Sequence, residues 1–148
     1  ALPCLTAFIP MLMDTGGNSG SQACVSIIRG ISLNEIEFRD LGRVVWKEIR
    51  VSVLCGVCLA VACFAKIVVV DMLLLKSESV TYLVAFVVCA TMAVTVCLAK
   101  IVGSTLPLLA KKLGFDPAVM ASPIITTIVD FLSLLVYFAF ATAILGIG

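Results

Sequence analysis

The segment that decides the fold runs from Val80 to Ala99 and reads VTYLVAFVVCATMAVTVCLA. It has no charged residue and is long enough to cross the hydrocarbon core of a bilayer, which takes about 20 helical residues. A spanning segment must be a helix or a strand of a closed barrel, and this run lacks the period-2 alternation of barrel strands. The segment therefore predicts a transmembrane helix, with an extension towards Leu109.

The rest of the chain has the same apolar character. Of the 148 residues, 62% are hydrophobic and 13% are charged, whereas soluble domains are about 45–50% apolar and about 25% charged. Three more apolar stretches lie at 1–13, 51–75 and 117–148, and the first can continue as a helix through a Gly-rich patch to Ile31. The predicted fold class is all-α: a polytopic bundle of helices in a lipid bilayer.

Composition also bears on the function. The net charge is +1 and there is no His, so neither a nucleic-acid-binding module nor a His-ligated metal site is indicated. No nucleophile–base pair or cofactor motif is visible, so we do not expect an enzyme. The CGVC pair, Cys55 and Cys58, has redox-motif spacing, but small apolar residues suit helix contacts in lipid, and we interpret it as packing.

Basic residues predict the orientation. They gather between the first and second stretches and, as Lys111 and Lys112, between the third and fourth, whereas the hairpin between the second and third has only Lys76. By the positive-inside rule, the two basic loops are cytoplasmic. We expect a multi-pass protein of the plasma membrane with an extracytoplasmic C-terminus.

Two further expectations concern charges near the ends of the spans. The amphipathic segment 34–50 is predicted to be a helix on the membrane surface that leads into the second span. Lys66 and Lys100 are expected to extend towards the headgroups.

The last apolar stretch has a carboxylate in its middle, Asp130. An acidic residue at mid-membrane costs about 2.5–3.5 kcal/mol on insertion scales and usually faces a bundle interior or a water path. Residues at spacings of three or four continue its helix face: Ser122, Thr126, Ser133 and Tyr137. A hydrogen-bonded seam between helices would explain the hydroxyls. The carboxylate favours ion binding or permeation, with Asp130 as the cation ligand.

A second polar face lies in the Gly-rich sequence MDTGGNSGSQA. Gly16 and Gly20 have the small-xxx-small spacing that lets helices approach closely. Packing explains these glycines but does not require the polar residues that recur every fourth position. We therefore predict a second wall of the same water-filled path, formed by Asp14, Asn18 and Gln22.

Prolines punctuate the segment between the third and fourth stretches. One helix is predicted to end near Leu113, and the next to begin at Pro117 with Asp116 as its N-cap. Pro123 is then expected inside that helix, where it would weaken the hydrogen-bond ladder or form a simple kink.

The ligand chemistry favours a hard cation, because the polar faces offer oxygen atoms without thiolate or imidazole. One carboxylate per chain cannot enclose a dehydrated divalent ion, but a two-fold dimer supplies two. Mg²⁺ usually keeps several waters while it touches one or two carboxylates. The residues alone leave Ca²⁺, Na⁺ and a proton relay open.

Three stretches resemble the transmembrane domain of the MgtE family of magnesium channels and transporters: PMLMDTGGNSGSQA, AKIVGSTLPLLAKKLGFDPAVMASPIITTIVD and the following LLVYF. The resemblance covers essentially the whole chain. It implies a homodimer that conducts hydrated Mg²⁺ through a pore at its interface, lined by the Gly-rich helix (1–31) and the last helix (117–148). It also implies that Asp130 binds Mg²⁺ largely through waters and that the Thr126 backbone contributes to the filter. The predicted pore-lining set is Asp14, Asn18, Gln22, Ser122, Thr126 and Ser133.

The resemblance also predicts the domain organisation. Family members have five membrane helices and cytoplasmic regulatory domains, so residues 1–148 correspond to the transmembrane pore domain without the first helix and those domains. The chain begins inside an apolar run without Met, and we expect a piece of a larger protein. Two alternatives are a proton- or Na⁺-coupled secondary transporter of divalent cations that uses Asp130, and a non-conducting module that dimerises through Gly16 and Gly20.

Overall fold

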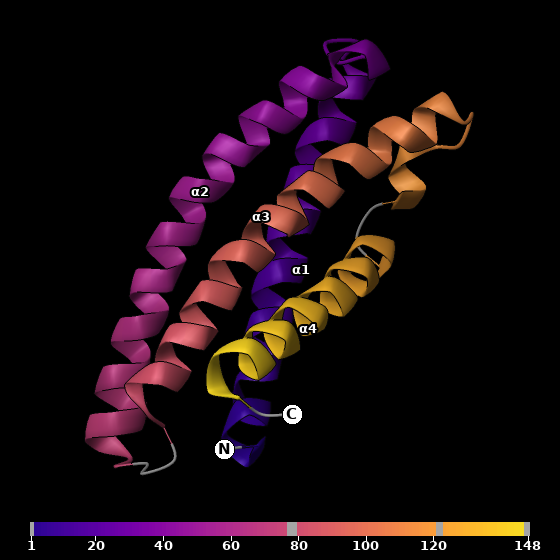
Figure 1. Cartoon of the computed structure of the whole chain (residues 1–148). Coiled ribbons are helices and arrows are strands. Elements are labelled where there is room, and N and C mark those ends of the chain that lie inside the picture. The colour runs from indigo at the N-terminus through magenta and orange to yellow at the C-terminus, as the bar shows by residue number, and fades with distance from the viewer. Residues whose placement is uncertain (1, 77–79, 121–122, 147–148) are drawn as a thin grey trace.

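The computed structural model describes residues 2–76, 80–120 and 123–146, and within these ranges it contains helices and no strand. The predicted all-α fold is confirmed (Figure 1). The long helices are α1 (Leu2–Ser32), α2 (Leu41–Lys66), α3 (Tyr82–Lys112) and α4 (Pro123–Leu145). The short elements are the 3₁₀ turns η1 (Phe38–Asp40) and η3 (Pro117–Met120) and the π-helical segment η2 (Ile67–Leu74), which continues α2.

Helix α3 lies at the centre of the bundle. It packs against α1, α2 and α4, and α1 also packs against α4. In Figure 1, α2 and α4 flank α3 on opposite sides, and α1 lies behind it. The segment predicted from Val80 to Ala99 falls almost entirely in α3, which accordingly buries a larger share of its residues than α2 or α4.

Three helical stretches of the described chain are long and apolar enough to cross a membrane: Phe38–Leu74, Tyr82–Lys112 and Pro123–Leu145. Helix α1 has the length, but polar residues interrupt its apolar surface. The chain is therefore a multi-pass bundle of membrane helices.

Close backbone contacts hold α1 against its neighbours. A Cβ atom added at Gly16 would lie 2.7 Å from Thr95 Cγ2 on α3 and 2.9 Å from Val129 Cγ1 on α4. One added at Gly20 would lie 3.1 Å from the carbonyl oxygen of Ala99. Because both glycines are buried inside one chain, a second copy cannot pack against them, so the alternative of dimerisation through Gly16 and Gly20 does not fit the structure.

The termini end of the bundle has an apolar core that also contains the ring and hydroxyl of Tyr137. Leu5, Phe8 and Leu12 of α1 pack there with Val88 of α3 and Tyr137 of α4. The Tyr137 hydroxyl donates a hydrogen bond of 2.9 Å to the carbonyl oxygen of Leu5. This bond ties the first turns of α1 to α4.

Replacing Tyr137 with Phe is expected to lower the free energy of unfolding by about 1 kcal/mol, because one buried hydrogen bond is lost while the ring remains. Thermal unfolding in detergent measures the change. The matched control is Tyr82→Phe at the exposed start of α3, which should leave the midpoint unchanged. Equal midpoints for the two variants would contradict the assigned bond.

The prediction of a surface helix over 34–50 that leads into the second span is wrong in its extent, because residues 34–40 form a loop and a 3₁₀ turn. Helix α2 begins at Leu41 and continues without a break through Arg50 to Lys66. No Pro or Gly lies between Arg43 and Cys55, so nothing interrupts the hydrogen-bond ladder where the polar part meets the apolar part.

The predicted start of the last helix is also corrected. The described residues show a 3₁₀ turn from Pro117 and then α4 from Pro123. Asp116 Oδ1 accepts a hydrogen bond of 2.9 Å from the Ala118 amide, which is the predicted capping role on a shorter element. Pro123 is the first residue of α4 and not a kink within it, because at this position its missing N–H would have no helical partner.

Lys100 and Lys66 each have a carboxylate partner in the structure. Its side chain is 12% exposed, and Nζ lies 3.6 Å from Glu48 Oε2, itself on a side chain 9% exposed. Lys100 therefore pairs with a carboxylate of α2 inside the bundle. Lys66, 45% exposed, pairs with Asp71 at 2.7 Å and lies over the Phe8 ring.

Candidate cation site between α1 and α4

A small hollow of about 130 Å³ lies between α1 and α4. It brings together residues from both polar faces identified in the sequence. Its lining consists of Met13, Asp14, Gly17, Asn18, Thr126 and Asp130.

The α1 wall depends on a glycine. Asp14 and Asn18 lie one turn apart and both are exposed, while Gly17 lies beside them without a side chain. A Cβ atom at Gly17 would lie 3.2 Å from Thr126 Cγ2 and 3.7 Å from Asp130 Oδ1. The absence of that atom keeps the space in front of the Asp130 carboxylate open.

The α4 wall consists of Thr126 and Asp130, also one turn apart. The Thr126 hydroxyl donates a 3.1 Å hydrogen bond to the carbonyl oxygen of Pro123. Since α4 begins at Pro123, Asp130 lies about 10 Å along this helix at about 1.5 Å per residue, and not about 20 Å as counted from Pro117.

Two carboxylates share the hollow without a cationic partner. Among the described residues, neither Asp14 nor Asp130 forms an ion pair or accepts a hydrogen bond. A negative site in a membrane protein is costly unless it faces water or a cation. The arrangement therefore favours binding of a cation.

One chain does not enclose a metal ion. The part of the chain that the structure describes contains no group of three or more Cys, Asp or Glu side chains suited to hold one. Two carboxylates with an amide and a hydroxyl suit a hard ion that retains part of its water shell.

The other predicted site residues lie elsewhere. Gln22 is exposed one turn beyond Asn18 and does not line the hollow. Ser133 is buried, and its hydroxyl donates a 2.7 Å bond to the Val129 carbonyl oxygen. Ser122 lies outside the described residues. On this face of α4, Thr126 and Asp130 line the hollow, whereas Ser133 and Tyr137 are buried inside the bundle.

Sequence reasoning missed two lining residues, Met13 and Gly17. Spacing could have identified both. Met13 directly precedes Asp14 and Gly17 directly precedes Asn18, and Met13 and Gly17 lie one helical turn apart.

Comparison with known proteins assigns the chain to a family. Residues 9–140 match the MgtE model, described as a divalent cation transporter. The chain belongs to the MgtE family. The predicted resemblance is confirmed, and the matched MgtE region includes all six residues that line the hollow.

Three MgtE relatives are each called "Magnesium transporter MgtE". The relative from Bacillus subtilis is 34% identical over 139 residues, which is 94% of this chain and 29% of the relative. The one from Thermus thermophilus is 33% identical over 145 residues, 98% of this chain and 30% of the relative. The one from Enterococcus faecalis is 31% identical over 138 residues, which is 93% of this chain and 29% of the relative. The chain thus spans about three tenths of the length of these relatives.

Proposed function

We propose that the chain is the pore-forming membrane part of a magnesium channel. Two copies would face each other across the hollow, and hydrated Mg²⁺ would pass between their Asp130 side chains. The observation that carries this proposal is the pair of unneutralised carboxylates, Asp14 and Asp130, on one face of a membrane-helix bundle. Membership of the MgtE family and the names of the three relatives support magnesium as the cation.

The size of the hollow is consistent with a hydrated ion. The hollow of about 130 Å³ has room for more than one water-sized molecule. Mg²⁺ takes about six oxygen ligands in octahedral geometry and releases its waters reluctantly. A second hollow facing the first would complete the space around such an ion.

The ion would meet different groups on each wall. Asp130 would accept hydrogen bonds from the waters of the ion and supply negative charge, while Asn18 would orient waters from the α1 side. Asp14 would add charge one turn away, and Thr126 would contribute its backbone. Gln22 would lie beyond the narrow part of the path.

The orientation follows from the distribution of charge over the two ends of the bundle. The loops that contain η1 and η3 lie at one end, and the N- and C-termini lie at the other (Figure 1). The loop end has Arg29, Arg43, Lys111 and Lys112. We place this end in the cytoplasm and the C-terminus outside, in a multi-pass protein of the plasma membrane.

Flux through reconstituted protein tests the function. Mg²⁺ uptake into liposomes should follow the Mg²⁺ gradient and persist after proton and Na⁺ gradients are collapsed. Uptake that stops when one of those gradients is removed would identify a coupled secondary transporter instead. Intact protein with neither uptake nor Mg²⁺ binding would identify a structural module.

Replacing Gly17 with Ala is expected to reduce Mg²⁺ flux about fivefold, because the new methyl group occupies the space in front of Thr126 and Asp130. An overpacking penalty of about 1 kcal/mol at the site corresponds to this factor. The measurement is initial uptake at equal protein density. Gly42→Ala, whose added Cβ meets nothing within 4 Å, is the control, and equal flux in both variants would exclude Gly17 from the path.

A further inference from the structure

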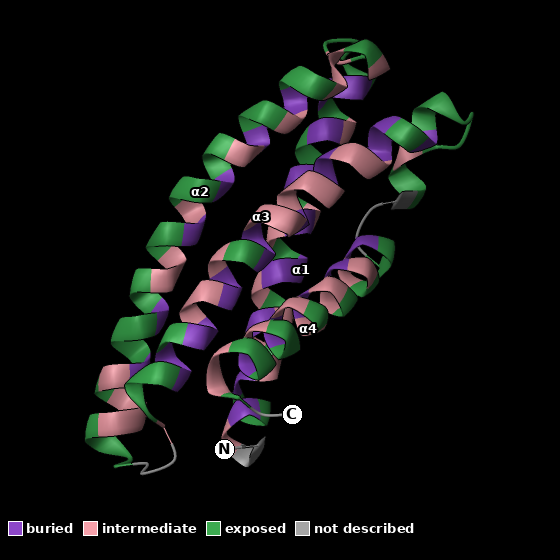
Figure 2. Cartoon of the chain, in the orientation of Figure 1, coloured by how far each residue is buried: buried purple, intermediate pink, exposed green. Residues whose placement is uncertain are grey.

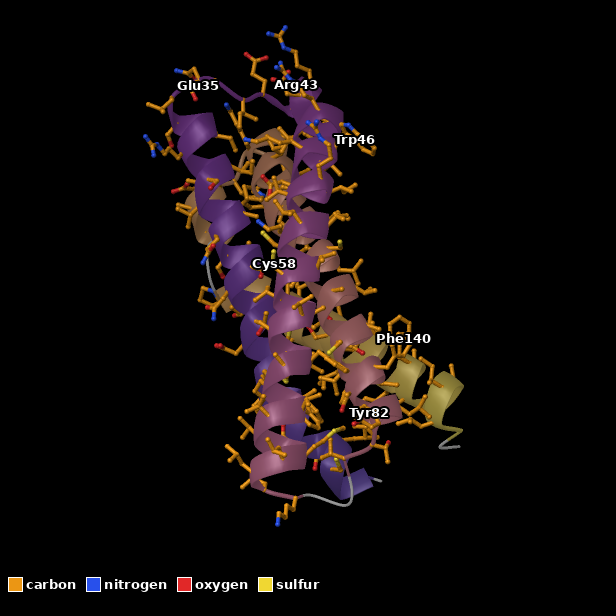
Figure 3. The ribbon with its side chains drawn as sticks, turned by 90° about the vertical axis from the view of Figure 1, so that its left-hand side faces the viewer. Glu35, Arg43, Trp46, Cys58, Tyr82 and Phe140 are labelled. Atoms are coloured by element: carbon orange, nitrogen blue, oxygen red, sulfur yellow. The ribbon has the colours of Figure 1, made fainter. Side chains whose placement is uncertain are left out.

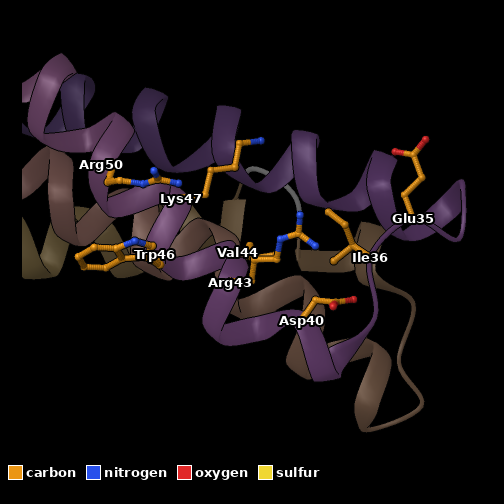
Figure 4. A pocket seen from close by; sticks show the side chains of 8 residues that line it. All are labelled: Glu35, Ile36, Asp40, Arg43, Val44, Trp46, Lys47 and Arg50. Carbon is orange, nitrogen blue, oxygen red and sulfur yellow. The ribbon is translucent and has the colours of Figure 1, made fainter.

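A second polar pocket lies at the loop end of the bundle, away from the residues of the cation hollow. Its volume is about 420 Å³. Figure 4 shows Arg43, Lys47 and Arg50 on α2, with Glu35 contributed by the segment between α1 and η1. We call this site the basic pocket.

The three cations of the basic pocket share one face of α2. Their spacings of four and three residues place Arg43, Lys47 and Arg50 on successive turns. All three are exposed, and within the described chain none of them pairs with a carboxylate.

Two carboxylates also line the pocket but leave it net positive. Glu35 lies on the loop, and Asp40 lies in η1. Asp40 Oδ2 already accepts a hydrogen bond of 3.0 Å from the Glu37 amide. With three cations against two anions, the pocket favours an anionic ligand.

The face that bears these cations continues as an apolar surface. Beyond Arg50, the same spacing reaches Leu54, Cys58 and Val61, which are all exposed. Figure 2 shows exposed positions along the length of α2, and Figure 3 places Arg43 and Trp46 near one end of the helix and Cys58 midway. One helix face is therefore cationic for its first turns and apolar after Arg50.

This change of character coincides with the expected edge of the bilayer. Trp46 is 61% exposed, one turn before Arg50, and exposed Trp residues are enriched at the level of the lipid headgroups. The cations therefore lie at headgroup level, and Leu54 and Val61 lie at the level of the acyl chains.

We propose that the basic pocket binds the phosphate of an anionic phospholipid, whose acyl chains lie along the exposed apolar face of α2. A phospholipid has the same order of groups along its length: charged phosphate first, hydrocarbon after. A free phosphate ion would use the cations but not the apolar face below them. A zwitterionic lipid would lack the net charge that complements the pocket.

Lipid titration of the full chain in detergent tests the proposal. Native mass spectrometry would count bound phosphatidylglycerol and phosphatidylcholine for the wild type and for the variant Arg43→Gln/Lys47→Gln/Arg50→Gln. The wild type should retain phosphatidylglycerol about tenfold better than phosphatidylcholine, and the variant should lose this preference. The single variant Lys47→Gln removes only one charge and should lower the preference for phosphatidylglycerol about threefold.

A control variant removes the same number of charges from the same end: Arg29→Gln/Arg39→Gln/Lys111→Gln, all at exposed positions outside the pocket. It should retain the preference for phosphatidylglycerol. If both triple variants lost this preference equally, net charge alone would explain lipid binding, and the proposed site in the basic pocket would be wrong. Displacement of phosphatidylglycerol by inorganic phosphate would also overturn it, since the pocket would then bind the free anion.

Discussion

Replacing Asp130 with Ala or with Asn is expected to lower Mg²⁺ flux about a hundredfold or more. At an effective dielectric constant of about 20, two unit charges about 4 Å apart attract by about 4 kcal/mol. Each 1.4 kcal/mol or so of lost stabilisation costs about a factor of ten. Mg²⁺ carries two charges, but it is held through its waters, so it lies farther from the carboxylate and is better screened than such a pair. A loss of about 3 kcal/mol, in the same range as this attraction, corresponds to the expected hundredfold effect.

The two substitutions separate charge from shape. Asn retains the size and hydrogen-bonding oxygen of Asp but not its charge, so both variants should lose flux if charge is what matters. Uptake into liposomes, with inward Mg²⁺ gradients and equal protein density, measures the effect. Because no described hydrogen bond or ion pair involves Asp130, thermal stability should stay the same or rise.

Asp116→Asn is the matched control for Asp130→Asn. It changes the same chemical group in the loop before α4, where Asn can still accept the hydrogen bond from the Ala118 amide. Flux close to the wild-type value is expected. If both Asp130 variants also conducted within twofold of the wild type, the cation site proposed between α1 and α4 would have to be abandoned.

Replacing Gly103 with Ala is expected to destabilise the bundle by about 3 kcal/mol. A Cβ atom at this position would collide with the carbonyl oxygen of Gly20 and would lie 2.9 Å from its carbonyl carbon and 3.1 Å from its Cα. These are backbone atoms, so the clash cannot be relieved by a side-chain rotation, and α1 must move away from α3. Overpacking costs about 1–3 kcal/mol even where side chains adjust.

Thermal unfolding in detergent should show the Gly103→Ala midpoint lower by roughly 5–10 °C. Gly42→Ala provides the control, since the added Cβ meets nothing within 4 Å and Ala favours helix over Gly by up to about 1 kcal/mol. Its midpoint should be unchanged or slightly raised. A Gly103→Ala midpoint equal to that of the control would contradict the close contact between α1 and α3.

The helical fold could be predicted because apolar runs without charges have few alternatives in a bilayer. Val80–Ala99 identified α3, and the predicted end near Leu113 is confirmed by the C-cap at that residue, followed by Gly114 with φ of 82°. The start of α4 was missed because Pro117 after Asp116 has the pattern of a helix start, and that pattern began only a 3₁₀ turn.

The site could be predicted only in part. Spacing placed Thr126 and Asp130 on one face and Asp14 and Asn18 on another, and the structure brings these four residues to one hollow. Spacing along one helix cannot show where a neighbouring helix crosses it. Figure 1 shows α4 inclined across α1, which accounts for the burial of Ser133 on the same face of α4.

The buried pair between Glu48 and Lys100 bears on how this protein enters the membrane. Both side chains are largely shielded by the packed helices, so either one alone would leave a buried charge without a partner, which costs about 3–5 kcal/mol. The two lie on α2 and α3, which are consecutive in the chain and joined at the termini end of the bundle. Because each buried charge is compensated by the other helix, α2 and α3 are expected to assemble in the membrane as a packed hairpin and not as two independent spans.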